Sequence, residues 1–447
     1  MAMTDLAQHI QATRLIDTHE HLRDEATYLA HGPDVLQDLF SHYLQGDLVV
    51  AGATPASVAR LTDASDADVA ARFAGVREAW ERCRHTGYGE AARLSARIVY
   101  GMEDITAEAL AAAHARNAAL RQPGERLRLL RDVARLDHVQ IQIDDRTVDD
   151  WQYPVDAAAP NFFLYDLSWR AFCAGEFAAE TIFTVTGVEV VSVESLRQAM
   201  AALFDRQGGR AIAVKSQHAY GRTLRWRERS DAEVEPVLHR HLAGHTLTDD
   251  ERLCLGDWCW ARGVELAITH RLPFKLHTGF YAGYGNMPID RVRAGHLTPL
   301  LTRYPQARFV LMHIAYPYSD ELIAIAKHYP NVWVDLCWAW SIDPRAAGDF
   351  VRRMIHAVPS NKLFAFGGDT NWATAAVGYA AQARIWLTRA LQAEVDEGLL
   401  TEREAIALST RLMRTNAEEC FDLPDVRAAI QRAIHAAPSL ASQHREI

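Results

Sequence analysis

From about residue 180 onward, short apolar runs alternate with longer amphipathic segments. The apolar runs have the length of strands and lie at residues 211–216, 273–279, 308–315, 331–338 and 363–370. The amphipathic segments carry apolar residues at helical spacing and lie at residues 192–206, 249–271, 289–304, 319–328, 344–358 and 373–398. Continuous apolar strands separated by helices predict a parallel sheet that helices cover on both faces.

Three earlier runs of strand length, at residues 14–19, 138–144 and 162–167, bring the number of predicted strands to eight. Short connections and right-handed crossovers allow either a doubly wound sheet or a closed barrel. Eight strands alternating with helices are typical of a (β/α)8 TIM barrel. We therefore predict an α/β fold in which residues 1–447 form a single barrel domain.

Residues 23–135 do not fit a simple β/α unit. They are rich in Ala, Arg and Glu and carry helical patterns at residues 66–86, 89–100 and 106–121. Because this segment directly follows the first strand, we expect it to begin at the mouth of the barrel. We interpret it as a helical insertion that serves as a lid or as an oligomer contact. Its candidate substrate contacts are Tyr28, Trp80, Arg84 and Tyr88.

The composition narrows the class of protein. The formal net charge is −10, and the sequence has no basic stripe of the kind that binds nucleic acid. No apolar run approaches the ~20 residues that cross a bilayer, and the first residues lack the apolar core of a signal peptide. The six cysteines are scattered without a CxxC pair, which is typical of reduced thiols. We expect a soluble cytoplasmic protein without nucleic-acid or membrane partners.

Polar residues that can bind metal or move protons stand at the ends of the predicted strands, where the chemistry of a TIM barrel lies. They are His19, His21, Lys215, His277, His313 and Asp369. Two histidines at positions i and i+2 of a strand point the same way, so His19 and His21 can reach one ion. An HxH pair alone is weak evidence. Burying an unpaired polar group costs ~1–3 kcal/mol, however, so a barrel would not gather six of them there without a use.

Several of these residues have structural alternatives. Asp369 can cap the following helix, and Asp335, on the seventh strand, is more simply a hydrogen-bonding residue. Lys215 is flanked by apolar residues, and desolvation lowers the pKa of a lysine. Its amine could form a carbamate that bridges two metals, act as a general acid or substrate charge, or pair with a barrel carboxylate. His218 fits a position on the rim of the site.

The motifs around these residues resemble the amidohydrolase superfamily. The stretches KSQHAYGR, KLHTGF, FVLMHIAYPY, YPNVWVDL and KLFAFGGDT, together with LIDTHEHL, resemble its amidohydrolase-2 branch. They are most similar to the barrel domain that is fused to glutamine-synthetase-like proteins. The resemblance covers residues 15–22 and 211–372. The long insertion resembles that of uronate isomerases, whereas HTGF and HIAYPY look like hydrolase sequences.

The resemblance implies a metal centre. Its ligands would be His19, His21, His277 and Asp369, around one divalent ion or two. Zinc suits this donor set, as do manganese and iron. Asp369 would also accept the proton of the attacking water, and His313 would be a second-metal ligand or an acid–base catalyst.

The resemblance also implies roles around the metal. Lys215 would belong to the catalytic group, and Tyr220 with Arg222 would hold a substrate carboxylate, although both could be surface residues of a lid. The expected activity is hydrolysis of an amide, ester or lactone in a small carboxylated substrate. The alternatives are a uronate-isomerase-like sugar-acid isomerase, a metal-dependent decarboxylase, and a non-catalytic barrel. A homo-oligomer is expected.

Overall fold

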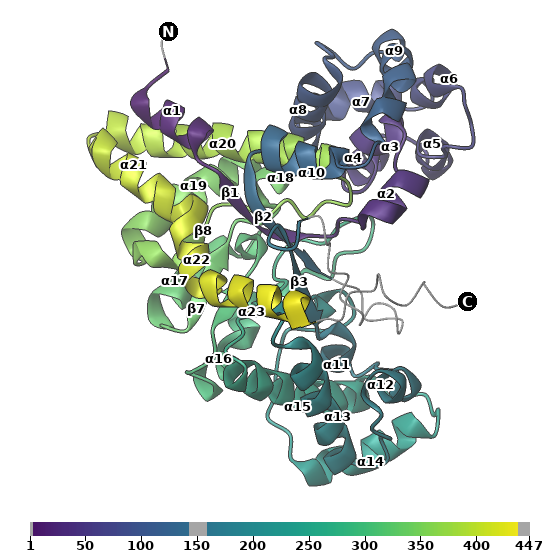
Figure 1. The fold of residues 1–447 in the computed structure, drawn as a ribbon, viewed down its shortest axis with the longest axis vertical. Helices are drawn as coiled ribbons and strands as arrows, with labels where there is room; N and C mark the ends of the chain where they lie inside the picture. Colours follow the sequence, from purple (N-terminus) through teal and green to yellow (C-terminus); the bar gives the residue numbers. More distant parts are fainter. Residues whose placement is uncertain (1–2, 143–158, 437–447) are drawn as a thin grey trace.

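Eight parallel strands form one barrel in the computed structural model, which describes residues 3–142 and 159–436 (Figure 1). The strands are β1 (Leu15–Glu20), β2 (Leu136–Gln142), β3 (Phe163–Ser168), β4 (Ala211–Ser216), β5 (Phe274–Leu276), β6 (Phe309–Leu311), β7 (Val332–Asp335) and β8 (Leu363–Phe364). They pair in sequence order, each parallel to the next. Hydrogen bonds from the Thr18 amide to the Phe366 carbonyl and from the Asp369 amide to the His19 carbonyl join the last segment to the first. The predicted (β/α)8 TIM barrel is confirmed. Residues 143–144, the end of one predicted strand, lie outside the described residues.

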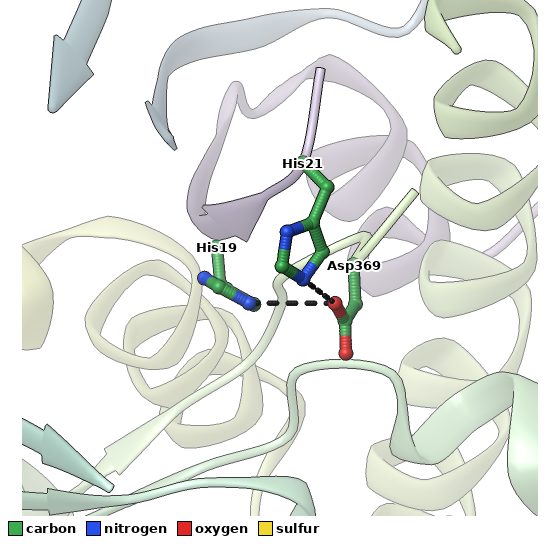
Figure 2. Close-up of side chains that lie close together, drawn as sticks. All are labelled: His19, His21 and Asp369. Carbon is green, nitrogen blue, oxygen red and sulfur yellow. Dashed lines mark ion pairs between the residues drawn. The ribbon is translucent and has the colours of Figure 1, made fainter. Parts of the chain in front are cut away.

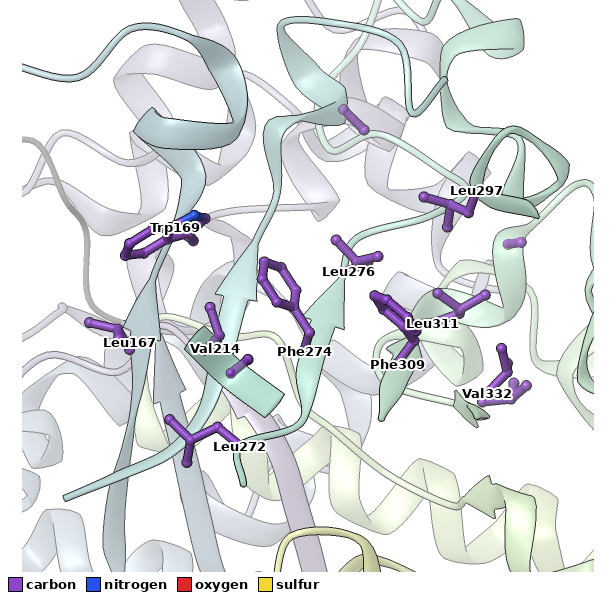
Figure 3. Close-up of a cluster of buried hydrophobic side chains, with 14 of the residues drawn as sticks. Leu167, Trp169, Val214, Leu272, Phe274, Leu276, Leu297, Phe309, Leu311 and Val332 are labelled. Carbon is purple, nitrogen blue, oxygen red and sulfur yellow. The ribbon is translucent and has the colours of Figure 1, made fainter. Parts of the chain in front are cut away.

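The strands hold together through the apolar layer that they share with the surrounding helices. Figure 3 shows part of this layer, with Val214, Phe274, Leu276, Phe309 and Leu311 between the strands and the helices. All five are fully buried. Burying such a side chain contributes about 1.5–3 kcal/mol, so this layer is a main source of the stability of the barrel.

The helices around the barrel begin at recognisable caps. The helix α15 (Asp249–Thr269) starts at Thr248, whose hydroxyl and the Glu251 carboxylate form a capping box. The remaining helices of the barrel and of the two chain ends are α1 (Asp5–Ala12), α11 (Arg170–Ala174), α12 (Ala179–Thr186), α13 (Val193–Gln207), α14 (Asp231–Leu242), α16 (Thr298–Arg303), α17 (Ser319–His328), α18 (Ala339–Ile342), α19 (Pro344–Ala357), α20 (Ala373–Asp396), α21 (Glu402–Thr410), α22 (Asn416–Cys420) and α23 (Leu423–Ala436).

The helix predicted over residues 289–304 is wrong in its first half. Two short 3₁₀ turns, Ile289–Val292 and Ala294–Leu297, precede α16. Pro299 has no amide hydrogen to donate to residue 295, so it is tolerated only in the first turn of a helix. This constraint matches the start of α16 at Thr298.

The segment between β1 and β2 is helical. It consists of α2 (Glu25–His31), α3 (Val35–Phe40), α4 (Leu44–Val50), α5 (Pro55–Leu61), α6 (Val69–Ala74), α7 (Arg77–Cys83), α8 (Gly87–Tyr100), α9 (Ala107–Asn117) and α10 (Glu125–Arg128). The helical pattern predicted over residues 66–86 is interrupted at Gly75, which caps α6. Phe40, Phe73 and Trp80 pack together as a core of this segment. Most of its helices gather at one end of the molecule, and α11–α15 lie at the other (Figure 1).

The insertion is attached to the barrel through α8, which lies against α20. The contact is so close that a Cβ atom at Gly378 of α20 would clash with the Ala91 carbonyl and the Ser95 hydroxyl of α8. The described residues contain no helix that is both long and apolar enough to cross a membrane.

A buried ion pair lies inside the barrel. The Lys275 ammonium donates to both carboxylate oxygens of Asp166, at 2.8 and 3.0 Å, and to the Thr18 carbonyl at 2.8 Å. Both side chains are fully buried. Burial raises the pKa of Asp166, and the neighbouring ammonium opposes this shift. The pair therefore ties β1, β3 and β5 together only while both partners are present.

We predict that Asp166→Asn lowers the free energy of unfolding by about 3–5 kcal/mol, because it leaves the Lys275 ammonium buried without its counter-charge. The shift of the urea unfolding midpoint measures the effect. Asp66→Asn is the control, because Asp66 pairs with an exposed Arg60 and solvent screens that ion pair. Equal midpoints for the two variants would contradict the prediction.

Candidate metal centre

Two histidines from the end of β1 share one carboxylate oxygen at the mouth of the barrel. The Nε2 atoms of His19 and His21 lie 3.3 and 3.1 Å from Asp369 Oδ1. Figure 2 shows both imidazole rings directed at this oxygen. His19 and Asp369 are buried, and His21 is partly exposed. The three side chains form a compact group with the right donor atoms for a divalent ion.

The backbone holds these residues in register. The Asp369 amide donates to the His19 carbonyl at 2.9 Å, and the His21 amide donates to the Thr370 carbonyl at 3.0 Å. The loop after β8 thus continues the pairing with β1. Asp369 itself has a φ of 57°, a left-handed conformation that is uncommon for a residue with a side chain.

Two buried acids on β1 bind the same loop. Asp17 Oδ1 accepts a hydrogen bond from the Gly368 amide at 3.1 Å, and Glu20 Oε2 accepts from the amide and the hydroxyl of Thr370. Burial raises the pKa of Asp17 to about 7 and raises the pKa of Glu20 as well. The loop is therefore fixed on both sides of Asp369.

The glycines before Asp369 are required by crowding. A Cβ atom at Gly367 would lie 2.7 Å from Cys337 Sγ, and a Cβ atom at Gly368 would clash with Glu20 Oε1. The sequence GGD therefore lets the loop approach β1 closely enough to bring Asp369 to the two histidines.

His313 reaches the other oxygen of Asp369. Its Nε2 lies 3.8 Å from Asp369 Oδ2, and its Nδ1 lies 2.9 Å from the Cys337 carbonyl. The ring is fully buried, and Nε2 has no hydrogen-bond partner within residues 3–142 and 159–436. Burial lowers the pKa of His313 to about 4. The imidazole is therefore neutral, which suits a metal ligand or a general base.

Lys215 lies beside His19. Its Nζ is 3.2 Å from His19 Nε2 and 3.0 Å from Met312 Sδ. Burial lowers the pKa of the amine to about 8. In the part of the chain that is described, Lys215 forms no salt bridge with a carboxylate, and Lys275 takes the barrel carboxylate of Asp166 instead. The carbamate, general-acid and substrate-charge roles of Lys215 stay open.

His277 lies near the centre, and one of its ring nitrogens faces a backbone carbonyl. Its Nε2 lies 3.0 Å from the Phe280 carbonyl, and its ring packs 4.4 Å from the ring of His313. It belongs to neither of the two ligand groups in the described residues. Its role as a metal ligand stays a prediction.

Tyr220 and Arg222, which were predicted to hold one substrate carboxylate together, have different surroundings. Tyr220 stacks on Tyr281 and lies 4.9 Å from the ring of His277, at the edge of the site. Arg222 instead forms a buried ion pair with Asp257 at 2.6 Å and donates to three backbone carbonyls. Its guanidinium is therefore committed to holding the β4–α14 connection.

Asp335 and His218 were not predicted to be ligands, and the structure shows what each contacts. Asp335 accepts hydrogen bonds from the Thr18 hydroxyl at 2.6 Å and the Cys337 amide at 2.8 Å, which is the structural role expected for it. His218 is buried against Trp260, with Nδ1 2.7 Å from the Ser216 hydroxyl, so its predicted place on the rim is wrong.

The insertion approaches the centre through residues that the sequence did not single out. Tyr43 stacks on Trp338 at 4.2 Å, and Trp338 packs 5.4 Å from the ring of His313. His42, with a φ of 69°, contacts Tyr43. The adjacent aromatic residues His42 and Tyr43 lie in the turn between α3 and α4, and no helical periodicity in the sequence signals this contact.

The four candidate substrate contacts predicted in the insertion lie in its core, on its surface or behind Tyr43. The ring of Tyr88 stacks on that of Tyr43, at 5.5 Å, and Tyr43 in turn stacks on Trp338. Trp80 lies in the core of the insertion, and Arg84 forms ion pairs with Glu81 and Asp104. Tyr28 packs 6.4 Å from Trp372 in the β8–α20 loop.

The residues present fit a divalent ion. The donor atoms of His19, His21 and Asp369 lie within 4.8 Å of one another, and so do those of His313, Cys337 and Asp369. Desolvation lowers the pKa of His19, which keeps the imidazole neutral. Imidazole and carboxylate donors suit zinc, manganese and iron.

Comparisons with known proteins support the resemblance to the amidohydrolase branch. Residues 230–423 match the family described as Amidohydrolase. Protein fluG of Emericella nidulans is 32% identical over 115 residues, and the match spans 24% of this chain and 13% of that protein. The described resemblance to the amidohydrolase branch is thereby confirmed.

Solved structures extend the likeness to the whole architecture. The glucuronate isomerase of Caulobacter crescentus has a TM-score of 0.76 at 18% identity, with 94% of this chain and 93% of that chain covered. The uronate isomerase of Thermotoga maritima has a TM-score of 0.75 at 14% identity, with 93% and 96% covered. At these identities the likeness shows a shared fold.

We predict that Gly368→Ala weakens divalent-metal binding by roughly 10–100-fold, because the new Cβ atom displaces Asp369 from the histidines, as changes around metal ligands do. Calorimetric titration of the metal-free protein measures this. The control is Gly348→Ala in α19, where the added methyl group meets nothing within 4 Å. Unchanged affinity in Gly368→Ala would show that the loop adapts.

Proposed function

We propose that this chain is a divalent-metal-dependent hydrolase in which water attacks the amide, ester or lactone carbonyl of a small carboxylated substrate. The observation that carries the proposal is the convergence of His19 Nε2 and His21 Nε2 on one oxygen of Asp369 at the barrel mouth. A divalent ion in such a site lowers the pKa of bound water from 15.7 to roughly 7 and polarises a carbonyl oxygen. Zinc is the proposed ion.

Asp369 serves two purposes in this proposal because its oxygens face different partners. Oδ1 faces the two histidines, and Oδ2 faces His313. A carboxylate oxygen has two lone pairs, so Oδ2 can accept the proton of the attacking water while the group stays a ligand. His313 presents a neutral Nε2 to the same space, where it either moves a proton or binds a second ion.

Lys215 and Tyr220 complete the proposed site. Lys215 is buried beside His19, so its amine is placed to bind an anionic group of the substrate or to form a bridging carbamate. Tyr220 lies at the edge of the site and is proposed to contact the substrate. Arg222 is proposed to act indirectly, by holding the loop that carries Tyr220, since its donors are occupied.

A second candidate is isomerisation of a sugar acid. The likeness to two uronate isomerase structures extends over more than nine tenths of this chain and supports this alternative. Incubation of the zinc-loaded protein with carboxylated amides, lactones and uronates in ¹⁸O-labelled water separates the reactions. Label in a product carboxylate supports hydrolysis, aldose–ketose exchange supports isomerisation, and release of CO₂ supports decarboxylation. A homo-oligomer and a cytoplasmic location stay predictions from the sequence.

We predict that His313→Ala abolishes turnover but leaves one divalent ion bound, because His19, His21 and Asp369 remain. Metal analysis of the purified variant and an assay with the best substrate measure the two effects. His328→Ala is the control, since His328 lies at the end of α17 on the outside of the barrel. Retained turnover in His313→Ala would assign a structural role to His313.

The insertion is proposed to be a lid, because Tyr43 stacks on the Trp338 that covers His313. We predict that Tyr43→Leu raises KM roughly 2- to 10-fold, which corresponds to the ~0.5–1.5 kcal/mol of an aromatic contact. Phe73→Leu, in the core of the insertion, is the control for altered stability. If both variants changed KM equally, the effect would come from loosening of the insertion as a whole.

A further inference from the structure

A second group of ligand atoms lies next to the first and shares Asp369 with it. A ring nitrogen of His313, Cys337 Sγ and a carboxylate oxygen of Asp369 lie within 4.8 Å of one another. All three residues are buried, and Cys337 and His313 are fully so. The other five cysteines belong to no ligand group in the described residues.

The nitrogen of His313 that faces this space is uncommitted. Nδ1 is held by the Cys337 carbonyl at 2.9 Å, which leaves Nε2 as the free nitrogen. Nε2 is buried, lies 3.8 Å from Asp369 Oδ2, and has no hydrogen-bond partner in the two described ranges. A buried polar atom without a partner costs ~1–3 kcal/mol, so its position calls for a ligand. A backbone carbonyl that fixes one ring nitrogen while the other binds is the usual arrangement at metal sites.

The backbone of Cys337 is anchored in a way that aims its side chain. Its amide donates to Asp335 Oδ1 at 2.8 Å, and its carbonyl oxygen lies 2.9 Å from His313 Nδ1. A Cβ atom at Gly367 would lie 2.7 Å from Cys337 Sγ, so the glycine is what makes room for the sulfur beside the Asp369 loop. The thiol is in no disulfide.

We propose that His313, Cys337 and Asp369 Oδ2 bind a second, thiophilic divalent ion, and that Asp369 bridges it to the first ion. This inference rests on the proposed function, because Asp369 is a ligand of the first ion. One lone pair of Oδ2 would bind the second ion, and the other would stay available for the proton of the attacking water. Imidazole, thiolate and carboxylate donors at metal–ligand distances of ~2.0–2.3 Å suit zinc or cobalt. The Cys337 proton passes to solvent when the sulfur binds the ion.

Cobalt binding tests the inference without any substrate, since a thiolate bound to Co²⁺ gives a charge-transfer band in the near ultraviolet. Metal-free full-length protein is titrated with Co²⁺, and absorbance and bound metal are followed together. We expect two equivalents, with the band growing in the second. Cys337→Ser should remove the band, leave the first equivalent unchanged and weaken the second by at least ~100-fold, because changes outside the ligands already cost 10–100-fold.

Matched variants make each outcome decisive. Cys420→Ser, also a buried free cysteine, should keep the band, and Cys337→Ala replaces Cys337→Ser if thermal unfolding shows that the latter is not folded. Two equivalents without a band, or a band that survives both substitutions of Cys337, would overturn the inference. A single equivalent that His21→Ala abolishes would overturn the second site and leave the proposed function standing. No bound cobalt at all would overturn both.

Discussion

The closure of the barrel and the construction of the site depend on the same set of hydrogen bonds, those between β1 and the loop after β8. β8 pairs with β7 over only two residues, so β8 offers few regular strand-to-strand hydrogen bonds. The contact between β1 and the loop after β8 is called the seam. The amides of Thr18, His21 and Asp369 take over the pairing there, and the buried Asp17 and Glu20 bind the loop from the side. Because the donor atoms of the centre are carried by these residues, any slip of the seam would separate His19 and His21 from Asp369.

Much of the architecture was predictable because it rests on local patterns. Apolar runs without alternation indicated strands buried on both faces. All eight strands begin within two residues of the predicted starts, although β5 to β8 are shorter than predicted. The ends of those strands were enough to name His19, His21 and Asp369, which the structure brings together. Their role in binding metal stays a prediction.

Features that depend on the direction of a side chain or on distant partners were not predictable. Arg222 looked available because its partner, Asp257, is 35 residues away on α15. His277 occupies the expected strand end, but its ring turns to the Phe280 carbonyl. The approach of Tyr43 to Trp338 joins segments nearly 300 residues apart, and neither position has a periodicity that would reveal it. Sequence spacing gives the location of a residue on an element but does not give its rotamer.

Unusual backbone conformation is concentrated at the mouth of the barrel. His313, Trp338 and Asp369, which follow β6, β7 and β8, all have positive φ values between 57° and 63°. Each such residue costs of order 1 kcal/mol and persists only where the surroundings fix it. At Asp369, the buried acids Asp17 and Glu20 and the closely packed Gly367 and Gly368 supply that constraint. The backbone can therefore direct side chains toward the site where a regular strand would not.

The long separation of the two halves of the seam has a consequence for how the chain matures during its synthesis. His19 leaves the ribosome about 350 residues before Asp369, which at ~5–20 residues per second is a delay of roughly 20–70 s. Throughout that interval one edge of β1 has no partner, and exposed strand edges promote association with other chains. The helices that follow β1 carry their own apolar core of Phe40, Phe73 and Trp80 and can fold while the remaining strands are still being made.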